Sequence, residues 1–133
     1  MGAFRMQVLA LIFPYILGVS HSSGEETVIV NKEFNGREIK VRAGGVIRVD
    51  LEELGSAGYT WAIQDLDGEV FEVLNVKAEG VLAPGDTTGK PVLKTWNIRA
   101  KKPGKGELKF LHYRPWEGKE KAGASFVLKV RVL

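Results

Sequence analysis

The chain has 133 residues, 44% of them hydrophobic, which is enough for one domain with a single core. Its 19 lysines and arginines are nearly balanced by 16 aspartates and glutamates. The basic residues are also spread along the chain, which argues against binding to nucleic acid. There are no cysteines, and this excludes disulfides, a thiolate metal site and a cysteine nucleophile.

Residues 1–20 have the pattern of a secretory signal peptide. Arg5 precedes an almost wholly apolar run, and Ser20 is a small residue at a position compatible with cleavage. The apolar run is shorter than the ~20 residues that span a bilayer, so a signal is favoured over a membrane anchor. We expect cleavage near Ser20 or Ser22, export to the periplasm or secretion, and a mature domain over residues 21–133 that has no membrane attachment.

The rest of the chain consists of short runs with apolar residues at every second position, which is typical of strands with one buried face. Turn residues such as Asn35-Gly36 and Gly44-Gly45 separate the runs. Residues 69–79 carry apolar residues in two phases, which predicts a β-bulge. The expected strands are 27–30, 39–42, 47–52, 59–64, 69–79, 95–100, 108–112 and 125–132. Seven to eight strands predict an all-β, immunoglobulin-like antiparallel β-sandwich without disulfides, and we expect a monomer.

Three long connections, 54–58, 80–91 and 115–123, are expected to share one end of the sandwich. In an up-and-down run of strands, the connections alternate between the two ends. The short turns at 65–68 and 103–106 therefore fall at the opposite end. A cluster of long loops on a rigid sandwich is the arrangement by which antibody domains build a binding surface.

Trp116 begins the third long connection, in a polar segment with nothing apolar beside it. Pro115 marks the end of the preceding strand, because proline cannot donate to a sheet ladder. The tryptophan could fold back as a lid on the core, or it could anchor a protein partner, since tryptophan and arginine are enriched at binding hot spots. Its place beside two other long loops favours the anchor.

Few residues suit catalysis or metal binding. His21 lies at the signal boundary, and His112 has an inward strand position, so we expect His112 to be a satisfied core histidine rather than a base. Residues 65–68 begin like a calcium loop but lack its later ligands, and a plain turn is favoured. Glu52 and Glu53 point to opposite faces of a strand and cannot act as one acid–base couple. We expect no enzymatic activity, no cofactor and no metal.

Three further residues have structural explanations. Trp61 and Trp96 lie in phase with apolar neighbours on predicted strands and are expected in the core. Gly58 is expected at a backbone position that needs a positive φ angle.

Three sequence elements, in this order, resemble the chagasin family of cysteine-peptidase inhibitors. They are Gly58-Tyr59-Thr60-Trp61 after a small-residue loop, the glycine-rich loop at 84–91, and Arg114-Pro115-Trp116 after a Leu-x-Phe strand. The likeness extends from about Val46 to Val132, and Arg-Pro-Trp is its most specific part. The resemblance implies an immunoglobulin-like sandwich that blocks papain-like cysteine peptidases by wedging three loops, 54–58, 80–91 and 114–123, into the active-site cleft. Inhibition would be reversible and non-covalent, since the chain offers no reactive group.

Carried over by position, the resemblance implies that loop 54–58 faces the catalytic cysteine and histidine of the peptidase. Loop 84–91 would lie along one side of the cleft, with Arg114 and Trp116 on the other. The family usually has Asn-Pro-Thr-Thr before the glycine, whereas this chain has a glycine in place of the proline, so a looser tip would lose more entropy on binding. The expected peptidase-binding residues are Leu54, Gly55, Ser56, Ala57, Gly58, Tyr59, Gly85, Asp86, Thr87, Thr88, Gly89, Arg114, Pro115 and Trp116.

The alternative is an immunoglobulin-like adhesion or glycan-binding module. In that hypothesis Trp116 would serve as a stacking platform for a sugar ring.

Overall fold

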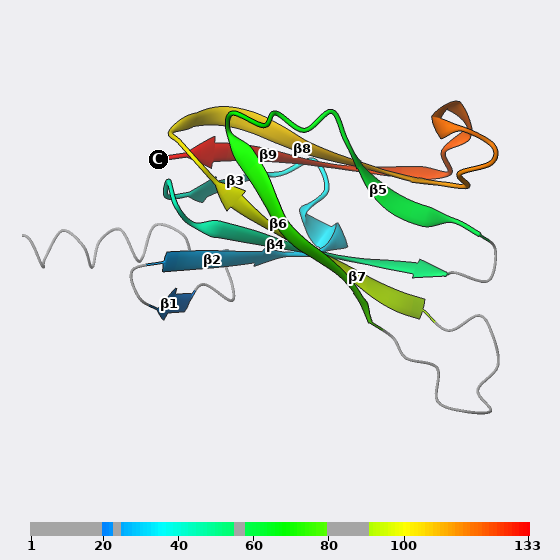
Figure 1. The fold of residues 1–133 in the computed structure, drawn as a ribbon, viewed down its shortest axis with the longest axis horizontal. Coiled ribbons are helices and arrows are strands. Elements are labelled where there is room, and N and C mark those ends of the chain that lie inside the picture. Colours follow the sequence, from blue (N-terminus) through cyan, green and yellow to red (C-terminus); the bar gives the residue numbers. More distant parts are fainter. Residues whose placement is uncertain (1–19, 23–24, 55–57, 80–90) are drawn as a thin grey trace, which may run out of the picture.

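The computed structural model describes residues 20–22, 25–54, 58–79 and 91–133 as two β-sheets packed face to face (Figure 1). Sheet A has the strand order β1-β2-β4-β7-β6, and sheet B has the order β3-β9-β8-β5. The strands are β1 (Ser20–Ser22), β2 (Glu25–Val30), β3 (Glu38–Val41), β4 (Val46–Leu54), β5 (Thr60–Gln64), β6 (Phe71–Glu79), β7 (Pro91–Ala100), β8 (Gly104–Tyr113) and β9 (Ala124–Val132). The described residues also contain two 3₁₀ turns between strands, η1 (Lys32–Phe34) and η3 (Lys119–Lys121).

The predicted immunoglobulin-like β-sandwich is confirmed, with one difference in strand direction. Five of the seven described strand pairs are antiparallel, but β2 runs parallel to β4, and β3 runs parallel to β9. Alternation of apolar residues identifies the buried face of each strand and carries no information on the direction of its neighbour. The two strands in these parallel pairs, β2 and β3, follow each other in the chain through η1 and belong to different sheets.

The short strand β1 was not predicted, several strand ends differ from the predicted ones by one or two residues, and two strands begin four residues earlier than predicted. β7 begins at Pro91 and not at Thr95, and β8 begins at Gly104, so most of the predicted turn 103–106 is strand. Gly104 pairs with Val132 of β9, and this long-range pairing outweighs the poor strand propensity of glycine. The bulge predicted within 69–79 is confirmed, since the register of β6 on β7 shifts between Val73 and Asn75.

The core lies between the two sheets and contains both tryptophans that were expected there. Trp61 is 8% exposed and Trp96 is 2% exposed. The ring of Phe110, on β8, packs edge-on against Trp96 of sheet A and Phe126 of β9, at centroid distances of 4.7 and 5.9 Å. These rings join the inner faces of the sheets, as expected for a sandwich without disulfides.

The predicted signal peptide falls almost wholly on residues 1–19, outside the described residues. β1 covers Ser20–Ser22, where cleavage is expected, and pairs with β2. Within the described ranges, no helix is both long enough and apolar enough to cross a membrane.

Candidate functional site

The strand ends that flank the three long connections lie together at one end of the sandwich, on the right in Figure 1. In sheet A, the last residue of β4, Leu54, pairs with the first residue of β7, Pro91. In sheet B, the first residue of β5, Thr60, pairs with the last residue of β8, Tyr113. The shared end predicted from the order of strands is therefore confirmed for the residues that bound these loops.

Some of the predicted site residues can be placed and others cannot. Gly55, Ser56 and Ala57, and all five predicted residues of the glycine-rich loop, Gly85, Asp86, Thr87, Thr88 and Gly89, lie outside the described residues. Leu54 is the last residue of β4. The structure brings four of the others into contact in two pairs: Gly58 with Trp116, and Tyr59 with Arg114.

Trp116 lies on the backbone of Gly58 and remains 71% exposed. A Cβ atom placed on Gly58 would overlap the ring at Cη2 and would come within 3.1 Å of Cζ2 and Cζ3. Gly58 has a φ of +82°, as expected from the sequence. Only glycine allows both the backbone angle and the close approach of the ring. Trp116 is therefore held at the loop end with most of its surface free, and it does not form a lid on the core.

Arg114 stacks on Tyr59. Its guanidinium carbon lies 4.6 Å from the centroid of the phenol ring, within the range of a cation–π interaction. Arg114 also pairs with Glu117, with Nη1 and Oε2 3.3 Å apart, and its carbonyl accepts a hydrogen bond of 2.9 Å from the Glu117 N–H. The sequence analysis missed Glu117, although opposite charges three residues apart were a signal that could have identified it.

His112 differs from the satisfied core histidine that was expected. It is half-buried and stacks on Trp61, with ring centroids 4.7 Å apart, and its centroid is 5.3 Å from that of Tyr59. Its Nε2 atom is buried and has no hydrogen-bond partner among the described residues. The flanking rings shield this atom from solvent. This burial lowers the pKa of His112 below its ordinary value of 6.5, against an opposing effect of the Glu53 carboxylate.

We expect His112 to make stability fall in mild acid. Because its pKa is lower in the folded chain than in the unfolded chain, the neutral ring favours folding above pH 6.5, and this contribution is lost as the pH falls through the folded pKa. An NMR titration should place its midpoint below 6.5. The fall in unfolding free energy between about pH 7.5 and about pH 5 should be smaller in His112→Asn. Equal pH dependence in the variant and the wild type would contradict the assignment.

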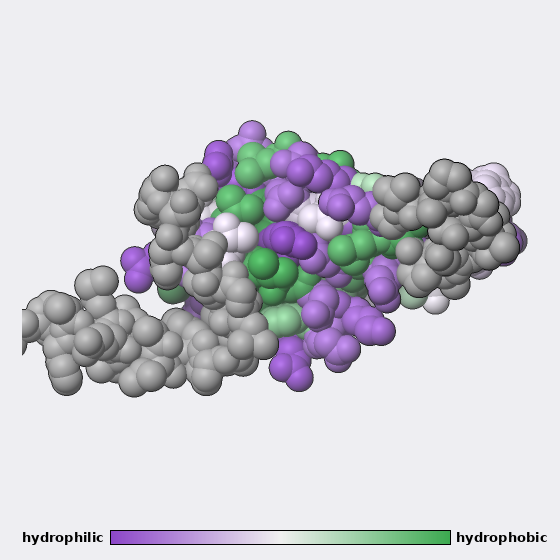
Figure 2. Space-filling view, turned by 90° about the horizontal axis from the view of Figure 1, so that it is seen from below, coloured by the Kyte–Doolittle hydropathy of each residue, from purple (hydrophilic) through white to green (hydrophobic). Residues whose placement is uncertain are grey.

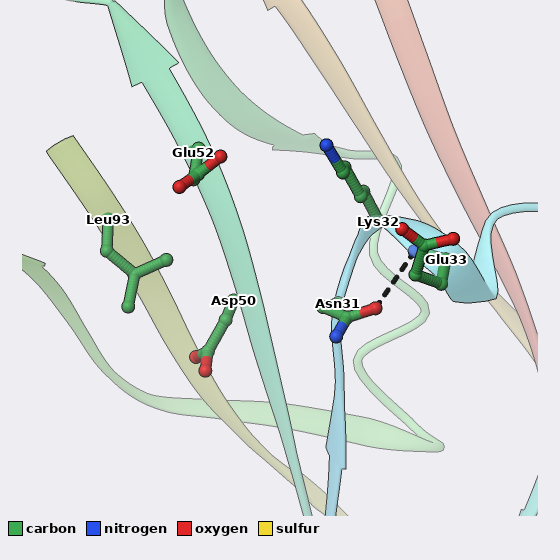
Figure 3. Close-up of a pocket in the computed structure, with 6 residues that line it drawn as sticks. All are labelled: Asn31, Lys32, Glu33, Asp50, Glu52 and Leu93. Atoms are coloured by element: carbon green, nitrogen blue, oxygen red, sulfur yellow. Dashed lines mark hydrogen bonds between the residues drawn. The ribbon is translucent and has the colours of Figure 1, made fainter. Parts of the chain in front are cut away.

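The described surface has a hollow on sheet A. It is lined by Asn31, Lys32, Glu33, Asp50, Glu52 and Leu93 (Figure 3). The carboxylate of Asp50 already has partners within the chain, since its Oδ1 accepts hydrogen bonds from Arg48 and Thr95. In the part of the chain that the structure describes, no three histidine, aspartate or glutamate side chains are placed to hold a metal ion. Figure 2, seen from the side of sheet A, shows hydrophilic and hydrophobic residues interspersed over the described surface.

Comparison with known proteins gives one family and several similar structures. The family model described as Chagasin family peptidase inhibitor I42 matches residues 40–130. The cysteine protease inhibitor EhICP2 of Entamoeba histolytica is similar in structure, with a TM-score of 0.71 and 20% identity over 80% of this chain and 96% of that chain. Amebosin, solved in solution, has a TM-score of 0.65 and 23% identity, over 79% and 96% of the two chains. No curated protein sequence matches this chain significantly. The two structures support the fold, and the family match extends over most of the described sandwich.

Proposed function

Because this chain belongs to the chagasin family of peptidase inhibitors, we propose that it inhibits papain-like cysteine peptidases reversibly and acts as a monomer. The observation that carries the proposal is the exposed ring of Trp116, held on Gly58 beside the stacked pair of Arg114 and Tyr59. A rigid aromatic and an arginine at the end of a sandwich have the character of binding hot spots. Preorganised contacts of this kind reduce the entropy lost on binding.

The inhibitor would work by occupying the cleft and not by reacting with it. Trp116 supplies apolar area that is still exposed to water, and the Arg114 guanidinium can donate to acceptors on the cleft wall. The chain contains no cysteine and offers no group for covalent attack on a peptidase. We therefore propose a binding protein and not an enzyme, with the backbone around residues 54–58 entering the narrow part of the cleft.

A titration of papain with the purified chain tests the proposal. Activity should fall linearly to zero at one inhibitor per active site and should return on dilution, and mass spectrometry should show no covalent adduct. No inhibition with the chain at micromolar concentration would refute the function.

We also propose that the chain is exported by its first 20 residues. Mass spectrometry of protein recovered from the exported fraction should show a new N-terminus near Ser20 or Ser22. An intact N-terminus on all of the recovered protein would contradict cleavage at this position.

We expect Gly58→Ala to weaken inhibition by about tenfold or more, because the added methyl group displaces a hot-spot ring. Gly36→Ala is the matched control, since Gly36 has a φ of +80° and nothing within 4 Å of an added Cβ. Both variants carry the backbone strain of a positive φ, about 1 kcal/mol of unfolding free energy. Only Gly58→Ala should raise the inhibition constant for papain. Equal inhibition constants would show that the contact with Trp116 has no role in binding.

A further inference from the structure

Two charged side chains form hydrogen bonds with backbone groups on the free edge of β5, next to the candidate site. β5 is an edge strand of sheet B, so alternate residues turn their N–H and C=O groups away from β8. The Trp61 N–H donates to Oε1 of Glu53 at 3.1 Å, and Nζ of Lys94 donates to the Trp61 carbonyl at 2.8 Å. Glu53 is on β4 and Lys94 is on β7, both in sheet A. Side chains of the opposite sheet thus take the place of a further strand.

Thr60 completes this arrangement, which we call the inter-sheet clasp: Glu53, Lys94, Thr60 and Trp61. The Thr60 hydroxyl donates to Oε1 of Glu53 at 3.4 Å and accepts from Nζ of Lys94 at 3.1 Å. The Trp61 indole donates to the backbone carbonyl of Glu52 at 2.9 Å. Lys94 is held over the ring of Trp96, 5.4 Å from its centroid. Five hydrogen bonds therefore hold the start of β5 against sheet A.

The inter-sheet clasp directly adjoins the residues on which the exposed side chains pack. Thr60 follows Gly58 and Tyr59 in the chain, so fixing Thr60 fixes the direction from which these two residues enter β5. We propose that Glu53 and Lys94 are positioning residues for inhibition: they hold Gly58 and Tyr59 where Trp116 and Arg114 pack on them. This inference rests on the proposed function.

The charges of Glu53 and Lys94 matter to this role. Both side chains are half-buried, and hydrogen bonds to ionised groups are stronger than those between neutral groups. Glu53→Gln keeps the shape and one acceptor oxygen, and it should have a smaller effect than Glu53→Ala. Lys94→Met keeps the alkyl chain and removes both donated hydrogen bonds.

The test measures the rate of association with papain, the exchange of the Trp61 amide hydrogen in the free protein, and the denaturation midpoint. Glu53→Ala and Lys94→Met should slow association and speed exchange, each about tenfold or more, since bonds to charged groups are lost. Glu52→Ala is the matched control, because its side chain is exposed and only its backbone carbonyl joins the clasp. It should leave both rates unchanged.

Four outcomes of this test would contradict the positioning role or the proposed function. Faster exchange with unchanged association would overturn the positioning role, and so would a loss of inhibition that merely follows the denaturation midpoint. Unchanged exchange would show that the clasp does not hold β5. If the wild-type chain fails to inhibit papain, the proposed function is wrong. Whether Glu53 and Lys94 position the residues on which Trp116 packs is then tested separately by NMR. The Trp116 indole N–H resonance must shift in Glu53→Ala and not in Glu52→Ala.

Discussion

Replacing Trp116 with alanine is expected to weaken inhibition of papain by about 2 kcal/mol or more, roughly a 30-fold rise in the inhibition constant. The ring is 71% exposed in the free chain and would be buried only in the complex. Its removal should therefore change the unfolding free energy by less than about 0.5 kcal/mol, as for other surface substitutions. Measuring the inhibition constant and a urea unfolding curve on the same sample separates the two effects.

Leu133→Ala is the matched control for Trp116→Ala. Leu133 is also an exposed large hydrophobic residue, 56% exposed, and it lies beyond β9 at the other end of the sandwich. Its truncation should leave the inhibition constant unchanged. An equal effect of the two substitutions, or none from either, would exclude Trp116 as the anchor of the binding surface.

Replacing Phe110 with alanine should have the largest effect on stability, a loss of about 3–5 kcal/mol in unfolding free energy. Phe110 is fully buried, and its ring contacts Trp96 of the opposite sheet and Phe126 of the neighbouring strand. Truncation leaves a cavity between the sheets. Small domains have only about 5–15 kcal/mol of stability in total, and this chain has no disulfide to offset the loss.

Urea denaturation followed by tryptophan fluorescence measures this loss directly. Lys109→Ala is the control, because Lys109 is the exposed neighbour of Phe110 on β8 and faces solvent. It should shift the midpoint little. A loss under about 1 kcal/mol for Phe110→Ala would mean that the sheets close over the vacant space, since the cost of a truncation depends on how far the site collapses.

Local pattern predicted much of this molecule because its strands alternate. Alternation identified which side chains face the core, including Trp61 and Trp96, and the two apolar phases of residues 69–79 predicted the bulge in β6. The order of short and long connections predicted which loops share an end. Each of these predictions depends only on residues that are close in the sequence or on the order of the strands.

The rest depends on contacts between distant residues, which no local pattern contains. The parallel pairs β2–β4 and β3–β9 are set by how the chain crosses between the sheets. The bonds of Glu53 and Lys94 to Trp61 join three strands. The prediction that His112 is a satisfied core histidine was wrong, because alternation gives the direction of a side chain and not whether a hydrogen-bond partner lies there.

The position of β9 has a consequence for how the protein is made. β9 is the last strand in the sequence, yet it lies inside sheet B between β3 and β8. It contributes Phe126, Leu128, Val130 and Val132 to the core. While β9 is still being synthesised, the strand that joins β3 to β8 is missing, and sheet B cannot be completed. A nascent chain therefore cannot complete sheet B, or the core that it shares with sheet A, until nearly the whole domain has been translated.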